Sequence, residues 1–188
     1  IPPSMQVTAT TSNGSIKVET MGSVAARSSN GSITVTGASG KVQAVTSNGS
    51  IKVDLDDPAE IGLTTSNASV TFRGLLIPGN HTIKTSNGSV NATLQDLPVE
   101  VDASTSNGKV RLAGNPAKRS AKAIVGPADS ADSKLQIRTS NASVTVNYKE
   151  TATEAITAVD NVGAECSVRW SFWGEPQGVS TGLVRRKR

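Results

Sequence analysis

The sequence has few of the residues on which disulfide bonding, metal binding and catalysis most often depend. Cys166 is its only cysteine and His81 its only histidine among 188 residues. A disulfide within the chain is therefore excluded, and so is a zinc site built from several cysteine and histidine ligands. Aromatic residues make up only 3% of the chain, so a hydrophobic core must consist mainly of Val, Ile, Leu and Ala. We predict no metal site and no cofactor.

Long hydrophobic runs and a real excess of one charge are also missing. No run of about 18 apolar residues occurs, which argues against a membrane-spanning helix within this chain. The formal net charge is +4, but the last four residues are all Arg or Lys, and without them 15 basic residues balance 15 acidic ones. A nucleic-acid-binding face is therefore not indicated. We interpret residues 175–188 as a flexible basic tail.

A six-residue motif recurs along most of the chain. Its cleanest copy is Thr-Ser-Asn-Gly-Ser-Ile at residues 46–51. A repeat of nearly constant length, close to 20 residues, is typical of proteins in which each unit packs only against its neighbours. The spacings between successive motif asparagines are 17, 18, 19, 20, 20 and 34 residues, and these asparagines are Asn13, Asn30, Asn48, Asn67, Asn87, Asn107 and Asn141.

Apolar and polar residues alternate on both sides of each motif asparagine. Around Asn48, the apolar positions are Val42 and Ala44 before it, and Ile51 and Val53 after it. This period of two predicts two short strands per repeat, each with one buried face, joined at the asparagine. A Thr or Ser stands two positions before every motif asparagine, and a Ser stands directly before it.

Two architectures fit this pattern. Asn-Gly between alternating strands is a strong hairpin signal and would give an antiparallel meander. Ala68 and Ala142 replace the glycine, however, and a hairpin gives no reason for the near-constant repeat length. We therefore favour an all-β fold, a single-stranded parallel β-helix (β-solenoid) with about seven to eight coils of 17–20 residues. In this prediction the stacked asparagines form an internal ladder of amide hydrogen bonds.

The predicted solenoid comprises residues 1–147. The spacing of 34 residues leaves about 14 more than a normal coil, which we interpret as an insertion loop at about 113–134. A degenerate coil is the alternative for that stretch. Residues 148–174 are interpreted as a degenerate coil and C-terminal cap, since a solenoid must cover its last coil. The aromatic residues expected to form this cap, or to contact a second copy, are Trp170, Phe172 and Trp173.

The Thr-Ser-Asn-Gly-Ser-(Ile/Val) repeats over about residues 5–147 resemble the adhesin-like family of bacterial and archaeal β-strand-repeat proteins. The resemblance implies a single-stranded β-solenoid that is secreted or displayed at the cell surface. Because the sequence begins at Ile1 without an initiator methionine, we expect a processed chain. The expected location is therefore extracellular or at the cell surface.

The fold and the resemblance together predict a non-enzymatic structural or adhesive module. One expected partner is a second copy in a head-to-tail contact, which would build filaments if the rotation does not close. The other is a glycan of the cell surface or matrix; nucleic acid and membrane insertion are not expected. Asn80 and Asn91 are the sequons expected to carry glycan, because the ladder copies should be sterically closed.

A polysaccharide-active β-helix enzyme, or a glycan-binding module, is the alternative function. Glu60 and Glu100 both lie seven residues before a motif asparagine. Stacking in chain order would place them two rungs apart, or roughly 10 Å, which is at the limit for an inverting pair of carboxylates. His81 lies near the start of a predicted strand, where a structural role fits better than that of a general base. We predict no catalytic residue.

Overall fold

The structure is a computed structural model, and it describes residues 5–20, 22–113, 118–127, 130–150, 167–168 and 182–183. The contacts divide the chain into two units, Ile1–Lys149 and Glu150–Arg188. In the second unit the described residues form two short strands, β16 (Ser167–Val168) and β17 (Gly182–Leu183), which pair in antiparallel fashion. The candidate site lies in the first unit.

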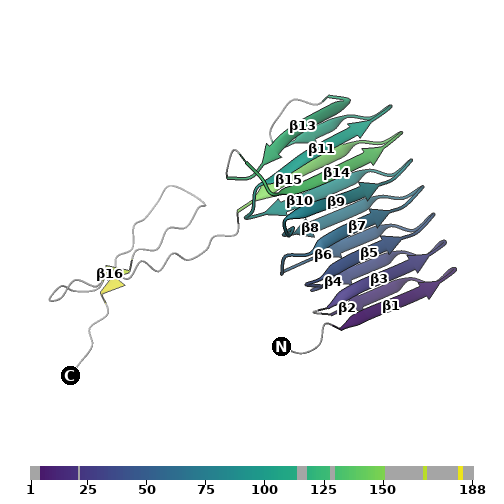
Figure 1. Cartoon of the computed structure of the whole chain (residues 1–188). Coiled ribbons are helices and arrows are strands. Elements are labelled where there is room, and N and C mark those ends of the chain that lie inside the picture. Colours follow the sequence, from purple (N-terminus) through teal and green to yellow (C-terminus); the bar gives the residue numbers. More distant parts are fainter. Residues whose placement is uncertain are drawn as a thin grey trace, which may run out of the picture. The chain divides into compact units, whose positions relative to one another are not determined.

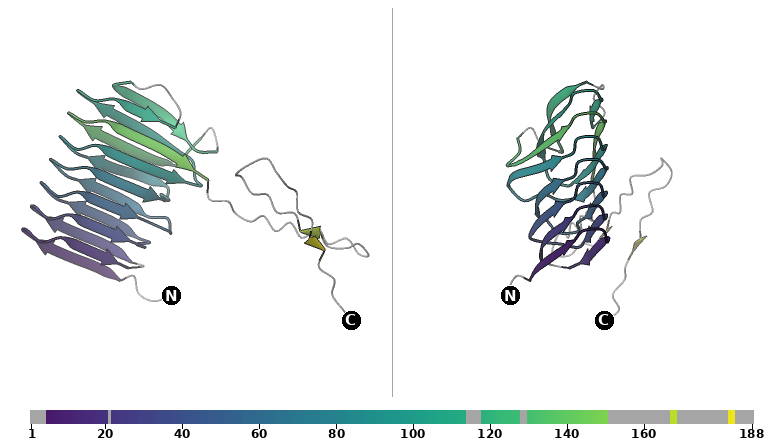
Figure 2. Two further views of the ribbon diagram at one scale, coloured as in Figure 1. Left: turned by 180° about the vertical axis from the view of Figure 1, so that it is seen from behind. Right: turned by 90° about the vertical axis from the view of Figure 1, so that its right-hand side faces the viewer.

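The first unit consists of two stacked sheets joined by corners and connections (Figures 1 and 2). Sheet A contains β1 (Gln6–Thr11), β3 (Ser23–Ser28), β5 (Lys41–Val45), β7 (Glu60–Thr64), β9 (Gly79–Lys84), β11 (Val99–Thr105), β13 (Ser120–Val125) and β14 (Ser133–Thr139). Sheet B contains β2 (Ile16–Glu19), β4 (Ile33–Thr36), β6 (Ile51–Asp54), β8 (Val70–Gly74), β10 (Val90–Gln95), β12 (Val110–Leu112) and β15 (Val144–Lys149). No helix occurs among the described residues.

Parallel pairing between successive repeats rules out the hairpin meander. β3 pairs in parallel with β1 and β5, and β4 pairs in parallel with β2 and β6. Each asparagine corner therefore joins a strand of sheet A to a strand of sheet B instead of turning back within one sheet. This is the arrangement of a parallel β-solenoid, and it confirms the predicted all-β class and parallel stacking.

The hydrophobic core lies between the two sheets, as the alternation predicts. Val42, Ala44, Ile51 and Val53 are at most 1% exposed, whereas Lys52 between the last two is exposed. The core is aliphatic apart from a few larger side chains such as Phe72. Burial of one strand face at about 25 cal/mol per Å² is the main term that stabilises such a stack.

The stacking order of the last repeats differs from their order in the chain. Sheet A has the order β9-β14-β11-β13, and sheet B has the order β10-β15-β12. The repeat made of β14 and β15 therefore lies between the repeat of β9 and β10 and the repeat of β11 and β12 (Figure 1). The stretch 113–134 supplies the reason. Within it β13 runs antiparallel along one edge of β11, so β14 takes the edge that faces β9.

The same stretch covers the end of the stack and is neither a plain loop nor a parallel coil. Lys118 and Val110 exchange two backbone hydrogen bonds, at 3.0 and 2.6 Å, along the outer edge of β12. The N–H of Thr105 donates to the carbonyl of Arg119 at 2.9 Å, and β13 then follows β11. We call residues 118–125 the closing segment.

Candidate functional site

The motif asparagines form a continuous ladder, but on the outside of the corner. Each Nδ2 donates to the Oδ1 of the next asparagine toward β1, at 2.6–2.8 Å. The ladder follows the spatial order Asn13, Asn30, Asn48, Asn67, Asn87, Asn141, Asn107. All seven side chains are exposed. The ladder itself was predicted; its internal placement is wrong.

The buried side chain of each corner is instead the Thr or Ser two positions before the asparagine. Thr46 is 3% exposed, accepts the N–H of Gly49 at 3.2 Å and donates to the carbonyl of Gly31 at 3.2 Å. It therefore bonds both within its own corner and to the rung below. A Cβ at residue 49 would lie 2.0 Å from the Gly31 oxygen, so close approach of backbones requires glycine here. The sequence shows that this Thr or Ser recurs, but not that its hydroxyl forms the buried hydrogen bonds of the corner.

His81 fills a structural position within β9 and is 1% exposed. Its Nδ1 accepts the N–H of Ile61 at 3.2 Å, and its Nε2 lies 2.8 Å from the carbonyl of Ile77, to which it donates. Both ring nitrogens are therefore engaged with backbone groups. Burial lowers the pKa of His81 below its ordinary value, against smaller opposing effects from Ile77 and Glu60. The imidazole is neutral, and neither nitrogen is left to serve as a general base.

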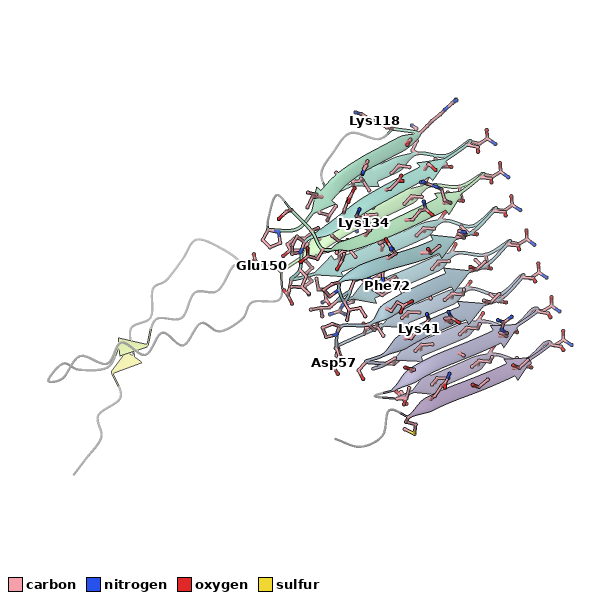
Figure 3. The ribbon with its side chains drawn as sticks, in the orientation of Figure 1. Lys41, Asp57, Phe72, Lys118, Lys134 and Glu150 are labelled. Atoms are coloured by element: carbon pink, nitrogen blue, oxygen red, sulfur yellow. The ribbon has the colours of Figure 1, made fainter. Side chains whose placement is uncertain are left out.

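The outer face of sheet A carries a polar surface hollow of about 310 Å³, which we call the charged hollow. Four neighbouring strands, β9, β14, β11 and β13, contribute to it. Lys134 marks its place in Figure 3, where a regular row of side chains also follows the corner of the stack. The side chains of the charged hollow belong to Asn80, Thr82, Glu100, Asp102, Lys122, Lys134 and Gln136.

Ion pairs hold both carboxylates of the charged hollow. Arg138 donates to the two oxygens of Asp102 at 2.9 and 2.8 Å, while Glu100 contacts both Lys122 and Lys134. The hydrogen bond from Lys122 lowers the pKa of Glu100, and the hydrogen bond from Arg138 lowers the pKa of Asp102. A glycosidase general acid needs the opposite, a carboxyl group whose pKa is raised.

Glu60 does not join this cluster. Its side chain pairs with Lys41 at 2.8 Å, on the neighbouring strand β5. The strands β7, β9, β14 and β11 are successive neighbours, so three strand spacings, or roughly 14 Å, separate Glu60 from Glu100. The expected separation of two rungs is wrong because β14 lies between β9 and β11.

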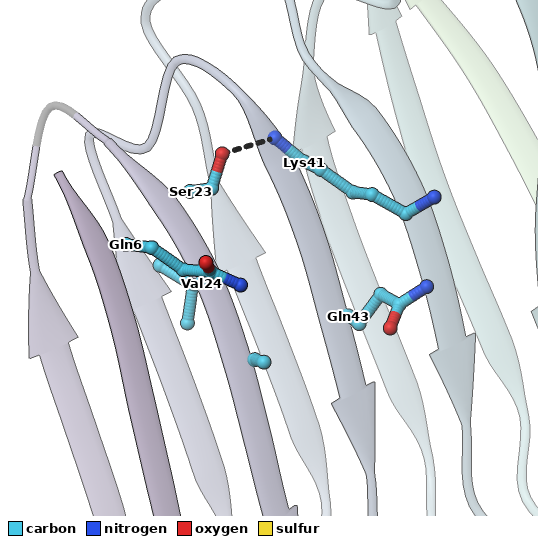
Figure 4. Close-up of a pocket in the computed structure, with 6 residues that line it drawn as sticks. Gln6, Ser23, Val24, Lys41 and Gln43 are labelled. Atoms are coloured by element: carbon cyan, nitrogen blue, oxygen red, sulfur yellow. Dashed lines mark hydrogen bonds between the residues drawn. The ribbon is translucent and has the colours of Figure 1, made fainter. Parts of the chain in front are cut away.

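A second, smaller hollow of about 220 Å³ lies on the same face near β1 (Figure 4). Gln6, Ser23, Lys41 and Gln43 contribute polar side chains to it. The hydroxyl of Ser23 accepts the backbone N–H of Lys41 at 3.1 Å. Lys41 pairs with Glu60, which does not line this hollow, so among its lining residues no ion pair joins one wall to another.

Of the remaining predicted positions, the glycosylation sites lie within the described residues and the aromatic cap does not. Asn80, the second residue of β9, and Asn91 on β10 are both exposed, and their glycosylation stays a prediction. Trp170, Phe172 and Trp173 lie outside the described residues.

Within the described ranges, no group of three or more His, Cys, Asp and Glu could hold a metal ion. The described part of the chain also has no helix of the length and hydrophobicity that a membrane span requires.

Comparisons of the chain with protein-family models, curated proteins and solved structures give no match.

Proposed function

We propose that the chain is a non-enzymatic extracellular or cell-surface module that supports adhesion, and that the charged hollow binds glycans. The observation that carries this proposal is the grid of polar side chains on β9, β14, β11 and β13. Glycan hydroxyls both donate and accept hydrogen bonds, so they match a surface on which amides, ammonium groups and carboxylates alternate. The resemblance of the repeats to adhesin-like proteins is consistent with this role.

Preorganisation supports the same conclusion. The ion pairs of Glu100 with Lys122 and Lys134, and of Asp102 with Arg138, fix the long side chains that line the hollow. Side chains that are already ordered lose less conformational entropy when a ligand binds. Because the strands that carry them belong to one hydrogen-bonded sheet, the grid has a rigid support.

The finer description of the fold belongs to this proposal as well. Each motif asparagine marks one coil, which gives seven coils in the first unit, and the aromatic residues near 170 act as a cap. Head-to-tail association through those aromatic residues is the alternative assembly, and it excludes a contact between two β1 and β2 ends, because both use the same edges. A following copy would have to dock on the closing segment, because that segment already occupies the edge of β11.

Binding to polysaccharides provides the test. Thr82 and Gln136 are register partners in the charged hollow, and Thr71 and Asn91 are register partners on the outer face of sheet B. We expect Thr82→Ala with Gln136→Ala to weaken co-sedimentation with insoluble cellulose, chitin or β-1,3-glucan by about tenfold, since several hydrogen bonds are lost. The matched control, Thr71→Ala with Asn91→Ala, should bind like the unaltered chain.

Two results would contradict the proposal. Equal binding by both double variants would show that the charged hollow is not the glycan site. Release of reducing ends from polygalacturonate or the other polysaccharides, abolished by Glu60→Gln or Asp57→Asn, would instead support the enzyme alternative.

A further inference from the structure

Among the described residues, no strand pairs with the outer edge of β1 or of β2, so this end of the stack leaves an open edge in each sheet. The carbonyl of Met5 accepts the N–H of Ser23 at 2.8 Å, so alternation turns the backbone groups of Gln6 and Thr8 away from β3. On β2, Ile16 donates to the carbonyl of Ser32 at 2.8 Å, which by the same alternation turns Lys17 and Glu19 to the open side. Unpaired backbone groups of this kind are templates for pairing with another strand.

The core is also least covered at this end. Ile16 and Val18 are each 8% exposed, whereas Ile51 and Val53, in the same columns two rungs deeper, are each 1% exposed. Val7 on β1 is only partly buried. A partner strand layer at this end would therefore remove apolar surface from water as well as pair backbone groups.

The opposite end is not equivalent, because the closing segment occupies the edge of β11 and the start of the edge of β12. Its exposed side chains include Lys118, Arg119 and Lys122. These side chains are all basic, and an edge strand with charges of one sign opposes pairing with a further strand. The strands β1 and β2 of one copy therefore find a better match in the β1 and β2 end of another copy.

We propose that two copies of this chain associate through their β1 and β2 ends about a twofold axis. Val7 lies six residues before Asn13 and Val18 five residues after it, so they hold corresponding inward positions on β1 and β2. An axis through these two valines pairs each strand antiparallel with its own copy. In sheet B it then places Lys17 of one copy opposite Glu19 of the other, twice. In sheet A it pairs Gln6 with Thr8, which carry no charge.

This register is favoured over its neighbour by charge. Moving the axis by one residue along β2 would place Lys17 opposite Lys17 of the other copy. Like charges directly opposite each other on paired strands are destabilising, whereas opposite charges are stabilising. In the single chain Lys17 and Glu19 are 4.0 Å apart and each side chain is 71% exposed, so both are available to a partner. The end is thus self-complementary, as a twofold interface requires.

Sedimentation velocity on the full chain over a range of concentrations tests the proposal. We expect a monomer–dimer equilibrium, with dissociation constants raised about tenfold or more in Lys17→Glu and in Glu19→Lys, because two attractive pairs become repulsive. An equimolar mixture of these two variants should dimerise again, since two acidic side chains of one copy then face two basic side chains of the other. The double variant Lys17→Glu with Glu19→Lys should dimerise like the unaltered chain.

The control variant is Lys52→Glu, which makes the same charge change in the same column of sheet B, two rungs deeper. It should leave the equilibrium unchanged. A strictly monomeric unaltered chain, or a mixture of the two single variants that fails to associate, would overturn the proposal. The proposal is independent of glycan binding, because the charged hollow lies on other strands and each test can fail without the other.

Discussion

The two ends of the solenoid carry the same repeat motif but are finished in different ways. At the first end β1 and β2 are outermost, and the inward residues of β1 are only partly buried, while Ile16 and Val18 on β2 are each 8% exposed. At the other end the chain leaves the repeat pattern, crosses the corner and runs back antiparallel as the closing segment. Edge protection in this protein therefore comes from the path of the chain, since the repeat motif itself provides none.

The corners show the same difference at the level of single side chains. Thr11 in the first corner is only partly buried, and its hydroxyl accepts the N–H of Gly14 at 3.1 Å in an exposed setting. Thr46 in an inner corner is buried and bonds to the rung below as well. One motif thus makes different contributions to stability according to what stacks beneath it.

The largest expected effect compares one core substitution near the two ends. Val101 on β11 is fully buried, and Val7 occupies the same column on β1 but is only partly buried. We expect Val101→Ala to lower the free energy of unfolding by about 2–3 kcal/mol through lost burial and a cavity, and Val7→Ala by less than about 1 kcal/mol. Urea denaturation measures both. Equal decreases in the free energy of unfolding for the two variants would mean that β1 is covered in solution. If the decreases become equal only at high protein concentration, the cover is the second copy in the dimer.

A smaller effect separates the first corner from the inner ones. Thr46→Val leaves the buried groups Gly49 N–H and Gly31 C=O without their partner, which should cost about 1–3 kcal/mol. Thr11→Val should cost less than about 1 kcal/mol, because water can reach Gly14. Asn48→Ala should also cost only about 1 kcal/mol, since the ladder is exposed. A greater loss for Asn48→Ala than for Thr46→Val in thermal unfolding would refute this ranking.

The smallest effect is a pH dependence of stability at His81, on β9 between the two ends of the stack. Burial lowers the pKa of His81 in the folded chain below 6.5, its value when exposed, so protons bind more tightly to the unfolded chain. The stabilising contribution of neutral His81 is therefore complete above about pH 6.5 and declines at lower pH, by at most about 1.4 kcal/mol per unit. Hydrogen exchange should show faster opening around Ile61 at pH 5 than at pH 7.

His81→Gln provides the control for that measurement, because glutamine does not titrate in this range. Its exchange rates, corrected for the intrinsic effect of pH, should be equal at pH 5 and pH 7. A chain with unaltered His81 that shows no loss of stability between these values would contradict the assignment of a buried neutral imidazole.

The parts of the structure that the sequence predicts are those set by regular patterns within each repeat. Alternation such as Val42, Ala44, Ile51 and Val53 identified the strands and their buried faces, and the asparagine recurrence identified the corner. The side on which the asparagines lie was predicted wrongly, because period two assigns faces to strands but not to turn residues. Thr46, two residues before Asn48, is the last residue before the corner whose side chain continues the alternation and is buried.

The stacking order could not be read from the repeats. The strands β11 and β14 present similar inward columns, Val101 and Ala103 in one and Leu135 and Ile137 in the other, so either would fit beside β9. The position of β13 decides between them, and its antiparallel direction has no signal in the repeat pattern. The charged hollow was missed for the same reason, since it combines strands that are not successive in the chain.

The displaced position of β14 and β15 has a consequence for how the chain is made. On the ribosome, residues 99–112 emerge before residues 133–149, yet their place in the finished stack lies beyond them. If β11 first docks beside β9, it occupies the site of β14 and must be released before folding can finish. A repeat protein that grows strictly by adding units to one end avoids this step. Here the repeat of β14 and β15 is synthesised after the repeat of β11 and β12 but stacks inside it, so synthesis and assembly run in different orders. In a shortened chain that ends at residue 113, β11 and β12 would have to stack directly on β9 and β10.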